Sequence, residues 1–375
     1  MTDKLKQLFT SSEIKSIINT TIKDRYHPLK RLLQPRGLQL NTIPIIWLLL
    51  RQYNCMAGIF FLRKSPRPRF GRDELVILNT DIAIRYIVEH HRNWLMSLKP
   101  RLLNVDDYST SSGTLGEIRA LGYLLQTGIS VNPIGKAGSD FWLSEGKEKA
   151  FVEVHSRQLN SDERKALENF HNKILRNIDS NGQANQRVSF VEYGTVPFGR
   201  PKIGENITEN AISKLASIKG KEHQMSSEET SILWLDFQDE TWDLLDTINR
   251  VLPLTTHNNA FYSGELWYAF YGWIDAPIYE AFRWDMVNDV VKMRHQGRFR
   301  QETKLDAVVV SFSRDTIILE NPYSRKPIKP WLWKRLVFLP RFNFEMSYTN
   351  WPAVNLRQRI ELEQEKLIAL SSIAL

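Results

Sequence analysis

Cysteine is nearly absent from this chain. Cys55 is the single cysteine among 375 residues. One thiol cannot form an internal disulfide or a cysteine-rich metal cluster, so both are excluded. So little cysteine is typical of a reducing compartment. Residues 1–13 carry acidic side chains and no continuous apolar core, so no signal peptide is expected. We therefore expect a cytoplasmic protein.

Long apolar runs are also scarce. The best candidate for a membrane span is residues 43–62, but Arg51, Gln52 and Asn54 interrupt it. A span needs about 20 consecutive apolar residues, and an arginine at the middle of a bilayer is costly. The segment is therefore expected to be a buried helix, and no membrane partner is expected.

Signatures of several enzyme classes are missing. The chain has no G-x-S-x-G, H-E-x-x-H or G-x-G-x-x-G motif. Residues 128–136 (GISVNPIGK) approximate a phosphate-binding loop, but six residues separate the glycines instead of four. Ala137 also stands where serine or threonine should follow the lysine. None of these motifs therefore assigns a chemistry to the chain.

Positive charge is in excess and unevenly spread. The formal net charge is +8, and the sequence pI is near 9.4. Residues 322–344 hold six Lys or Arg and no acid, interleaved with aromatic side chains. This mixture suits nucleic acid, which offers both phosphates and flat bases. A solvated surface whose apolar residues pack inward is the alternative. The expected phosphate contacts are Arg325, Lys326, Lys329, Lys334 and Arg335.

The predicted elements divide the chain into three units. These are a helical unit over residues 1–110, an α/β unit over residues 111–240, and a basic, aromatic-rich unit over residues 241–375. In the middle unit, hydrophobic periodicity predicts helices over 113–128, 161–178 and 209–220, and strands over 129–135, 140–143, 150–155, 187–193 and 230–237. Gly128 is the expected stop of the first helix.

Beyond residue 240 the patterns are less regular. They predict a helix over residues 276–297, a strand pair over 305–312 and 316–322, and a closing helix over 356–370. They leave open whether this unit is a separate domain or extends the same sheet.

Two carboxylates stand out in the predicted strands. Asp140 opens one strand, and Glu153 lies inside the next, two residues before His155. Because strand side chains alternate, Glu153 and His155 point to the same face. A hairpin turning at Gly146 would bring Asp140 near Glu153, and paired carboxylates suit Mg²⁺ or Mn²⁺. Glu117 on the preceding helix could add a third oxygen ligand. On an edge strand facing solvent, however, Glu153 would need no ion.

The array GEIRALGYLLQTGISV…GSDFWL…KAFVEVHSRQ resembles the PD-(D/E)XK, or restriction-endonuclease-like, nuclease superfamily. This resemblance implies an α/β fold with a mixed sheet built on an αβββαβ core. It also implies that Glu117, Asp140 and Glu153 bind Mg²⁺ or Mn²⁺ and that the protein hydrolyses nucleic-acid phosphodiesters, with DNA expected ahead of RNA. The large flanking units suggest protein partners in a restriction, phage-defence or mobile-element system, by analogy alone.

One position departs from the family pattern. His155 stands where the family has lysine. Histidine can act as a general base near neutral pH but lacks a permanent positive charge. Arg157, Lys165 or Lys173 could supply that charge and contact nucleic acid. Two alternatives therefore stay open: a degenerate nuclease-fold subunit that binds nucleic acid or protein without cleaving, and a protein–protein module whose basic surface is incidental.

Overall fold

The computed structural model of the chain describes twelve stretches of sequence. They are residues 4–14, 45, 72–104, 108–134, 140–156, 207–218, 228–238, 251–257, 260–282, 290–301, 304–350 and 355–373. The predicted helix over 161–178 and strand over 187–193 lie outside the described residues. So do Arg157, Lys165, Lys173 and all of the apolar run 43–62 except Ile45.

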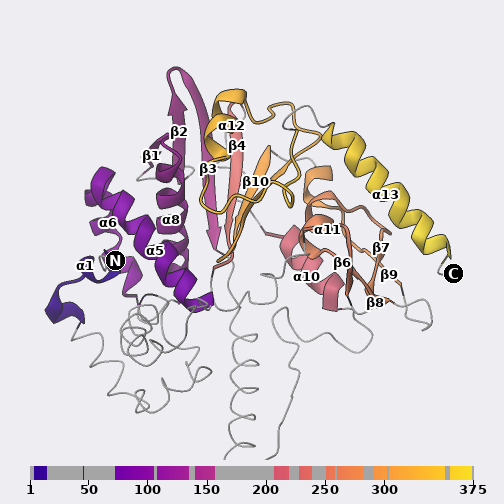
Figure 1. The fold of residues 1–375 in the computed structure, drawn as a ribbon, viewed down its shortest axis with the longest axis horizontal. Coiled ribbons are helices and arrows are strands. Elements are labelled where there is room, and N and C mark those ends of the chain that lie inside the picture. Colours follow the sequence, from indigo (N-terminus) through magenta and orange to yellow (C-terminus); the bar gives the residue numbers. More distant parts are fainter. Residues whose placement is uncertain are drawn as a thin grey trace, which may run out of the picture.

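A six-stranded mixed sheet forms the centre of the molecule (Figure 1). Its strands, in spatial order, are β1 (Ser130–Pro133), β2 (Phe141–Glu145), β3 (Glu148–Ser156), β4 (Thr230–Asp236), β10 (Ala307–Ser311) and β11 (Thr316–Glu320). Strands β1, β2 and β3 are antiparallel neighbours. Strands β3, β4 and β10 run parallel, and β11 is antiparallel to β10.

The burial of the inner strands explains their sequences. Every residue of β4, β10 and β11 is buried. Strands that are covered on both faces read as near-continuous apolar runs rich in Val, Ile and Leu, as in AVVVS and TIILE. The strand pair predicted over 305–312 and 316–322 is therefore confirmed, and it extends the same sheet as β3 and β4.

Helices cover both faces of this sheet (Figure 1). On one face, α5 (Arg72–His90) packs on α8 (Tyr108–Gln126), with α1 (Lys4–Gln7), α6 (Arg92–Ser97) and α7 (Lys99–Leu102) beside them. On the other face lie α10 (Ile207–Ala216), α11 (Glu265–Tyr271) and α13 (Leu356–Ile373). Each face has its own apolar core, so the molecule has three layers.

Helix α8 ends as its sequence predicts. Gly128 has φ +73°, the left-handed conformation that glycine adopts without strain. Its N–H donates to the carbonyl of Leu125 at 3.0 Å. Inside the helix, Gly122 lies against Ala83 of α5, where a Cβ atom would come within 2.4 Å of the Ala83 Cα. This close approach holds the two helices together.

The helix predicted over residues 276–297 is wrong. This stretch instead contributes β7 (Pro277–Ile278), β8 (Glu280–Phe282) and β9 (Val291–Lys292). Strand β8 joins β5 (Leu254–His257) and β6 (Ala260–Ser263) in a three-stranded sheet, and β7 pairs with β9. Ile278 and Tyr279 reach the core through this pairing, so tertiary contacts override the local helical pattern.

Two short helices complete the described part of the chain: η3 (Arg298–Arg300) and α12 (Pro330–Leu336). In that part of the chain no helix is both long enough and apolar enough to cross a membrane.

Candidate active site

Asp140 is fixed at the start of the β2–β3 hairpin. The strands pair with Phe141 opposite Val152, so the next step of the ladder sets Asp140 beside Glu153. The backbone N–H of Val154 donates to Asp140 Oδ2 at 2.8 Å. The Asp140 carbonyl accepts from Ile134 N at 2.9 Å. The residue is therefore anchored to both neighbouring strands, and the predicted approach of Asp140 to Glu153 follows from the register.

Glu153 lies in the interior of the sheet and is only 1% exposed. Strand β3 has β2 on one side and β4 on the other, so the alternative of an edge strand facing solvent is wrong. A carboxylate buried this deeply is costly unless its surroundings satisfy it. Glu153 is thus a buried carboxylate whose desolvation cost the residues around it must offset.

Glu153 and His155 share one face of the sheet. Their partners on the parallel strand β4 are Leu233 and Leu235. Both leucines belong to the core beneath α10 and α11. Val154 instead belongs to the core beneath α8. Because side chains alternate, Glu153 and His155 point away from the α8 layer.

Glu117 is engaged on the α8 layer. Arg101 of α7 donates to it in a bidentate pair, with Nη1–Oε2 at 3.0 Å and Nη2–Oε1 at 2.5 Å. This bond raises the pKa of Arg101, and the negative charges of Glu117 and Asp140 add to the effect. Arg101 therefore lies within the electrostatic reach of two predicted site residues. Sequence reasoning missed it because only the packing of α7 against α8 brings it there.

The predicted metal ligands fit a divalent ion only in part. Asp140 and Glu153 occupy neighbouring ladder positions and offer the oxygen donors that Mg²⁺ and Mn²⁺ prefer. Glu117 does not fit as the third ligand in this arrangement, because both its oxygens accept from Arg101. Among the described residues, no three His, Cys, Asp or Glu side chains gather closely enough to hold a metal ion.

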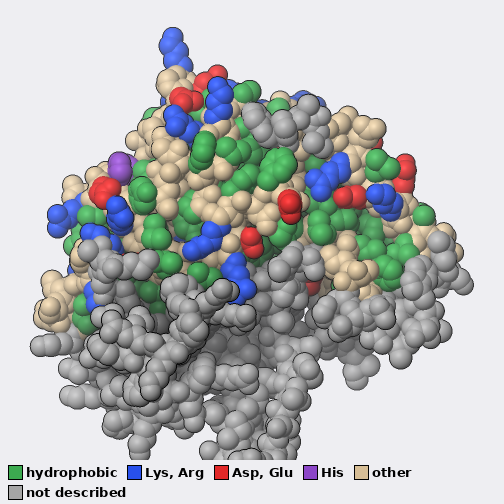
Figure 2. Space-filling view, in the orientation of Figure 1, with side chains coloured by type: hydrophobic (Ala, Val, Ile, Leu, Met, Phe, Trp, Pro, Cys, Tyr) green, Lys and Arg blue, Asp and Glu red, His purple; other side chains and the backbone are tan. Residues whose placement is uncertain are grey.

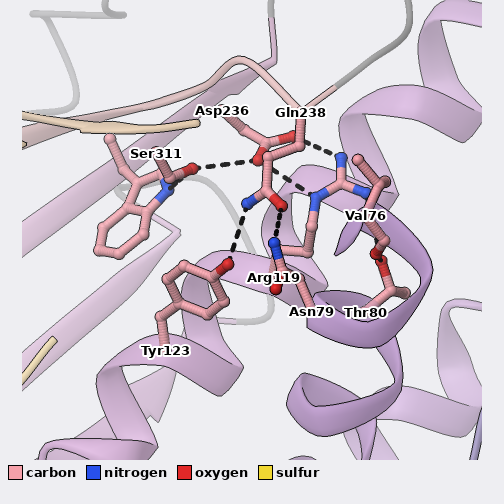
Figure 3. Close-up of polar contacts among 9 residues, drawn as sticks. Val76, Asn79, Thr80, Arg119, Tyr123, Asp236, Gln238 and Ser311 are labelled. Atoms are coloured by element: carbon pink, nitrogen blue, oxygen red, sulfur yellow. Dashed lines mark hydrogen bonds and ion pairs between the residues drawn. The ribbon is translucent and has the colours of Figure 1, made fainter. Parts of the chain in front are cut away.

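A buried polar cluster lies at the carboxyl end of β4 (Figure 3). Arg119 of α8 forms a bidentate ion pair with Asp236, with Nε–Oδ1 at 3.1 Å and Nη2–Oδ2 at 2.5 Å. The two side chains are 3% and 0% exposed. The Ser311 hydroxyl also donates to Asp236, at 3.1 Å, and accepts from Trp234 Nε1 at 3.2 Å. The pair joins α8 to the centre of the sheet.

The cluster extends to α5 through amide and phenol groups. Asn79 donates to Gln238 at 2.7 Å, and Gln238 donates to the Tyr123 hydroxyl at 3.3 Å. Burial raises the pKa of Tyr123 to about 12, so its phenol stays protonated. All of these groups are buried and bonded to one another (Figure 3), which is the arrangement expected of a structural network.

Of the five predicted phosphate contacts that lie in the described residues, three carry acidic partners. Lys329 pairs with Glu148, and Arg335 pairs with Glu145, both at the tip of the β2–β3 hairpin. Figure 2 shows acidic and basic side chains intermixed there, at the top of the molecule. Lys326 pairs with the buried Asp306 at 3.2 Å. These cations help to hold α12 and the preceding loop against the sheet.

Arg325 and Lys334 differ from these three. Both are exposed, and neither has an ion pair within the described ranges. The hairpin tip near Lys329 lies five strand residues from Glu153, or about 17 Å at the usual rise per residue. Lys329 thus lies well away from Glu153.

Comparison with family models, with curated proteins and with solved structures gave no match to this chain.

Proposed function

We propose that this protein is a metal-dependent hydrolase of nucleic-acid phosphodiester bonds, with an active site at Asp140 and Glu153 in a restriction-endonuclease-like core. The observation that carries the proposal is the hairpin itself. A helix precedes three antiparallel strands, and the third strand is parallel to β4. At the start of this hairpin, Asp140 is anchored beside a buried Glu153.

Each residue has a distinct role in this proposal. Asp140 and Glu153 would hold Mg²⁺ or Mn²⁺, which, when bound, polarises a phosphate oxygen and acidifies a bound water. His155, on the same face as Glu153, would accept a proton from the attacking water near neutral pH. Arg101 carries a permanent positive charge beside Glu117 and Asp140. It lies on the α8 layer, whereas His155 points to the opposite face of the sheet, so Arg101 would meet a phosphate beside Asp140 and would not take the place of the family's lysine.

A second candidate is a nuclease-fold subunit that binds nucleic acid without cleaving it. Two observations favour it. Arg101 occupies both oxygens of Glu117, and His155 replaces the lysine of the family pattern. In this case the Arg101 guanidinium would take the place of a metal ion beside Glu117. Asp140 and Glu153 would then be structural residues.

Cleavage assays separate the two candidates. Mixed DNA and RNA substrates are incubated with Mg²⁺ or Mn²⁺ and wild-type protein, Asp140→Asn, Glu153→Gln or the matched control Glu145→Gln. Glu145 is an acid of the same hairpin, at its exposed tip. The hydrolase proposal expects metal-dependent cleavage that falls by at least about 100-fold in the two site variants and stays unchanged in the control. Binding without cleavage by the wild-type protein would support the second candidate instead.

A further inference from the structure

Four side chains from separate segments form a row of alternating rings and guanidinium groups. We call it the arginine–aromatic row: Trp273, Arg300, Tyr323 and Arg357. The Arg300 Cζ lies 6.0 Å from the Trp273 ring centroid and 5.6 Å from the Tyr323 ring centroid. The Arg357 Cζ also lies 5.6 Å from the Tyr323 ring centroid. These are cation–π distances, so each guanidinium is attracted to a ring face.

Backbone contacts fix the row in place. Arg300 Nε donates to the Tyr271 carbonyl at 2.7 Å. The backbone N–H of Tyr323 donates to Asn321 Oδ1 at 2.9 Å, which holds the loop after β11 in a tight turn. Trp273 lies two residues after the end of α11, whose last turn is closed by the Gly272 N–H to the Tyr268 carbonyl at 2.9 Å. Arg300 and Tyr323 are therefore positioned before any partner binds.

The row reaches solvent at Tyr323 and Arg357, while the Nη2 atom of Arg300 is buried. Tyr323 is 37% exposed. Arg300 has no acidic partner within the part of the chain that the structure describes. Arg357 pairs with Glu361 one helical turn away, with side chains 63% and 51% exposed, and such pairs hold little energy in water. Arg325, two residues from Tyr323, adds a further exposed cation.

The geometry points to a binding surface for single-stranded nucleic acid at this row, and this inference rests on the proposed function. Unstacked bases stack on aromatic rings and on guanidinium planes, while arginines between the rings contact phosphates. A duplex fits less well, because its base faces are already stacked on one another. The row would therefore hold unpaired nucleotides of a single strand.

The position of the row suggests which nucleotides it holds. Strand β11 ends at Glu320, which aligns across β10 and β4 with Val152 of β3. Three strand spacings separate them, or about 14 Å. Tyr323 lies three residues further along the chain, so the row is separate from Asp140 and Glu153. It would bind nucleotides several positions away from the reacting phosphate.

Fluorescence anisotropy with a labelled oligothymidylate tests the inference, with EDTA present so that cleavage does not contribute. Tyr323→Ala should weaken binding by about 5- to 150-fold, the usual effect of losing one stacked base. Tyr323→Phe keeps the ring and should bind like the wild type. Phe344→Ala removes an aromatic ring of 48% exposure outside the row and should also bind like the wild type.

A second pair of variants tests the charge. Arg357→Gln should weaken binding at low salt and lower the slope of log affinity against log salt by about 0.7, the effect of one phosphate contact on a single strand. Arg85→Gln is the matched control, since Arg85 is 61% exposed and also pairs with a glutamate one turn away. It should leave both affinity and slope unchanged.

The outcomes separate this inference from the proposed function. If wild-type protein binds single strands and Tyr323→Ala binds them equally well, the row is not the binding site. That result would leave the proposed cleavage at Asp140 and Glu153 untouched, because the cleavage assay tests it separately. Binding to duplex but not to single strands would also contradict the proposal of a single-strand binding surface at the row. If the wild type neither binds nor cleaves any nucleic acid, the proposed function fails and the row fails with it.

Discussion

The ion pair between Arg119 and Asp236 should be the most sensitive point of the fold. Both side chains are buried, at 3% and 0% exposed, and two hydrogen bonds join them. Removing one partner from such a pair leaves an uncompensated buried charge and typically costs about 3–5 kcal/mol. We therefore expect Arg119→Met and Asp236→Asn each to lower the free energy of unfolding by about that amount.

The double variant gives the decisive comparison. In Arg119→Met/Asp236→Asn neither buried charge remains, and the asparagine oxygen can still accept the bond from Ser311. Replacing a buried pair by neutral groups of similar volume is often nearly neutral. The double variant should therefore be more stable than either single variant, with a loss of about 1–2 kcal/mol and a coupling energy of several kcal/mol.

Urea unfolding followed by circular dichroism measures these differences. The free energy of each variant comes from its midpoint and slope, and a changed slope would signal a change in the unfolded or native state. A loss under about 1 kcal/mol for either single variant, or strictly additive losses in the double, would refute the assignment of this pair as a buried structural link.

Three further predictions use other parts of the structure. Gly113→Ala should raise the melting temperature because a Cβ there meets nothing within 4 Å, whereas Gly122→Ala should lower it because the Cβ would press on the backbone of α5. Burial raises the pKa of Glu363, so the folded state takes up a proton, and stability falls as pH rises from the unfolded value of about 4.3 through the raised value. Thermal melts should show that Glu363→Gln raises the melting temperature relative to the wild type at pH 7 but not at pH 4. Lys334→Gln should weaken nucleic-acid binding more than Lys329→Gln, because Lys329 is already paired with an acid; equal losses in a binding titration would contradict this.

Local sequence patterns predicted most of the central sheet. The strands at 130–133, 141–145, 148–156 and 230–236 lie where alternation and apolar runs indicated, and α8 ends before Gly128 as expected. These elements follow from short-range periodicity, which the sequence displays directly. The helix predicted over residues 276–297 was wrong because the burial of this segment comes from strand pairing, whose partners are not adjacent in sequence.

The candidate site was predictable only in its hairpin. Asp140 and Glu153 are brought together by a local turn, and the register follows from it. Arg101 was missed because only the packing of α7 against α8 brings it to Glu117. The pair Arg119–Asp236 was missed because its partners are 117 residues apart in sequence and meet only through packing. The same packing joins Lys329 to Glu148, so charge counts along the chain overstated the free positive surface.

One measurement tests the central proposal most directly: single-turnover cleavage of a nucleic-acid substrate by the wild type, Glu153→Gln and Glu145→Gln, each with Mg²⁺, with Mn²⁺ and with EDTA. The proposal expects cleavage that EDTA abolishes, that Glu153→Gln loses by about 100-fold or more, and that Glu145→Gln retains. Equal metal-dependent cleavage by the wild type and Glu153→Gln would place the chemistry elsewhere. No cleavage by the wild type would contradict the hydrolase proposal and favour the second candidate, a subunit that binds without cleaving.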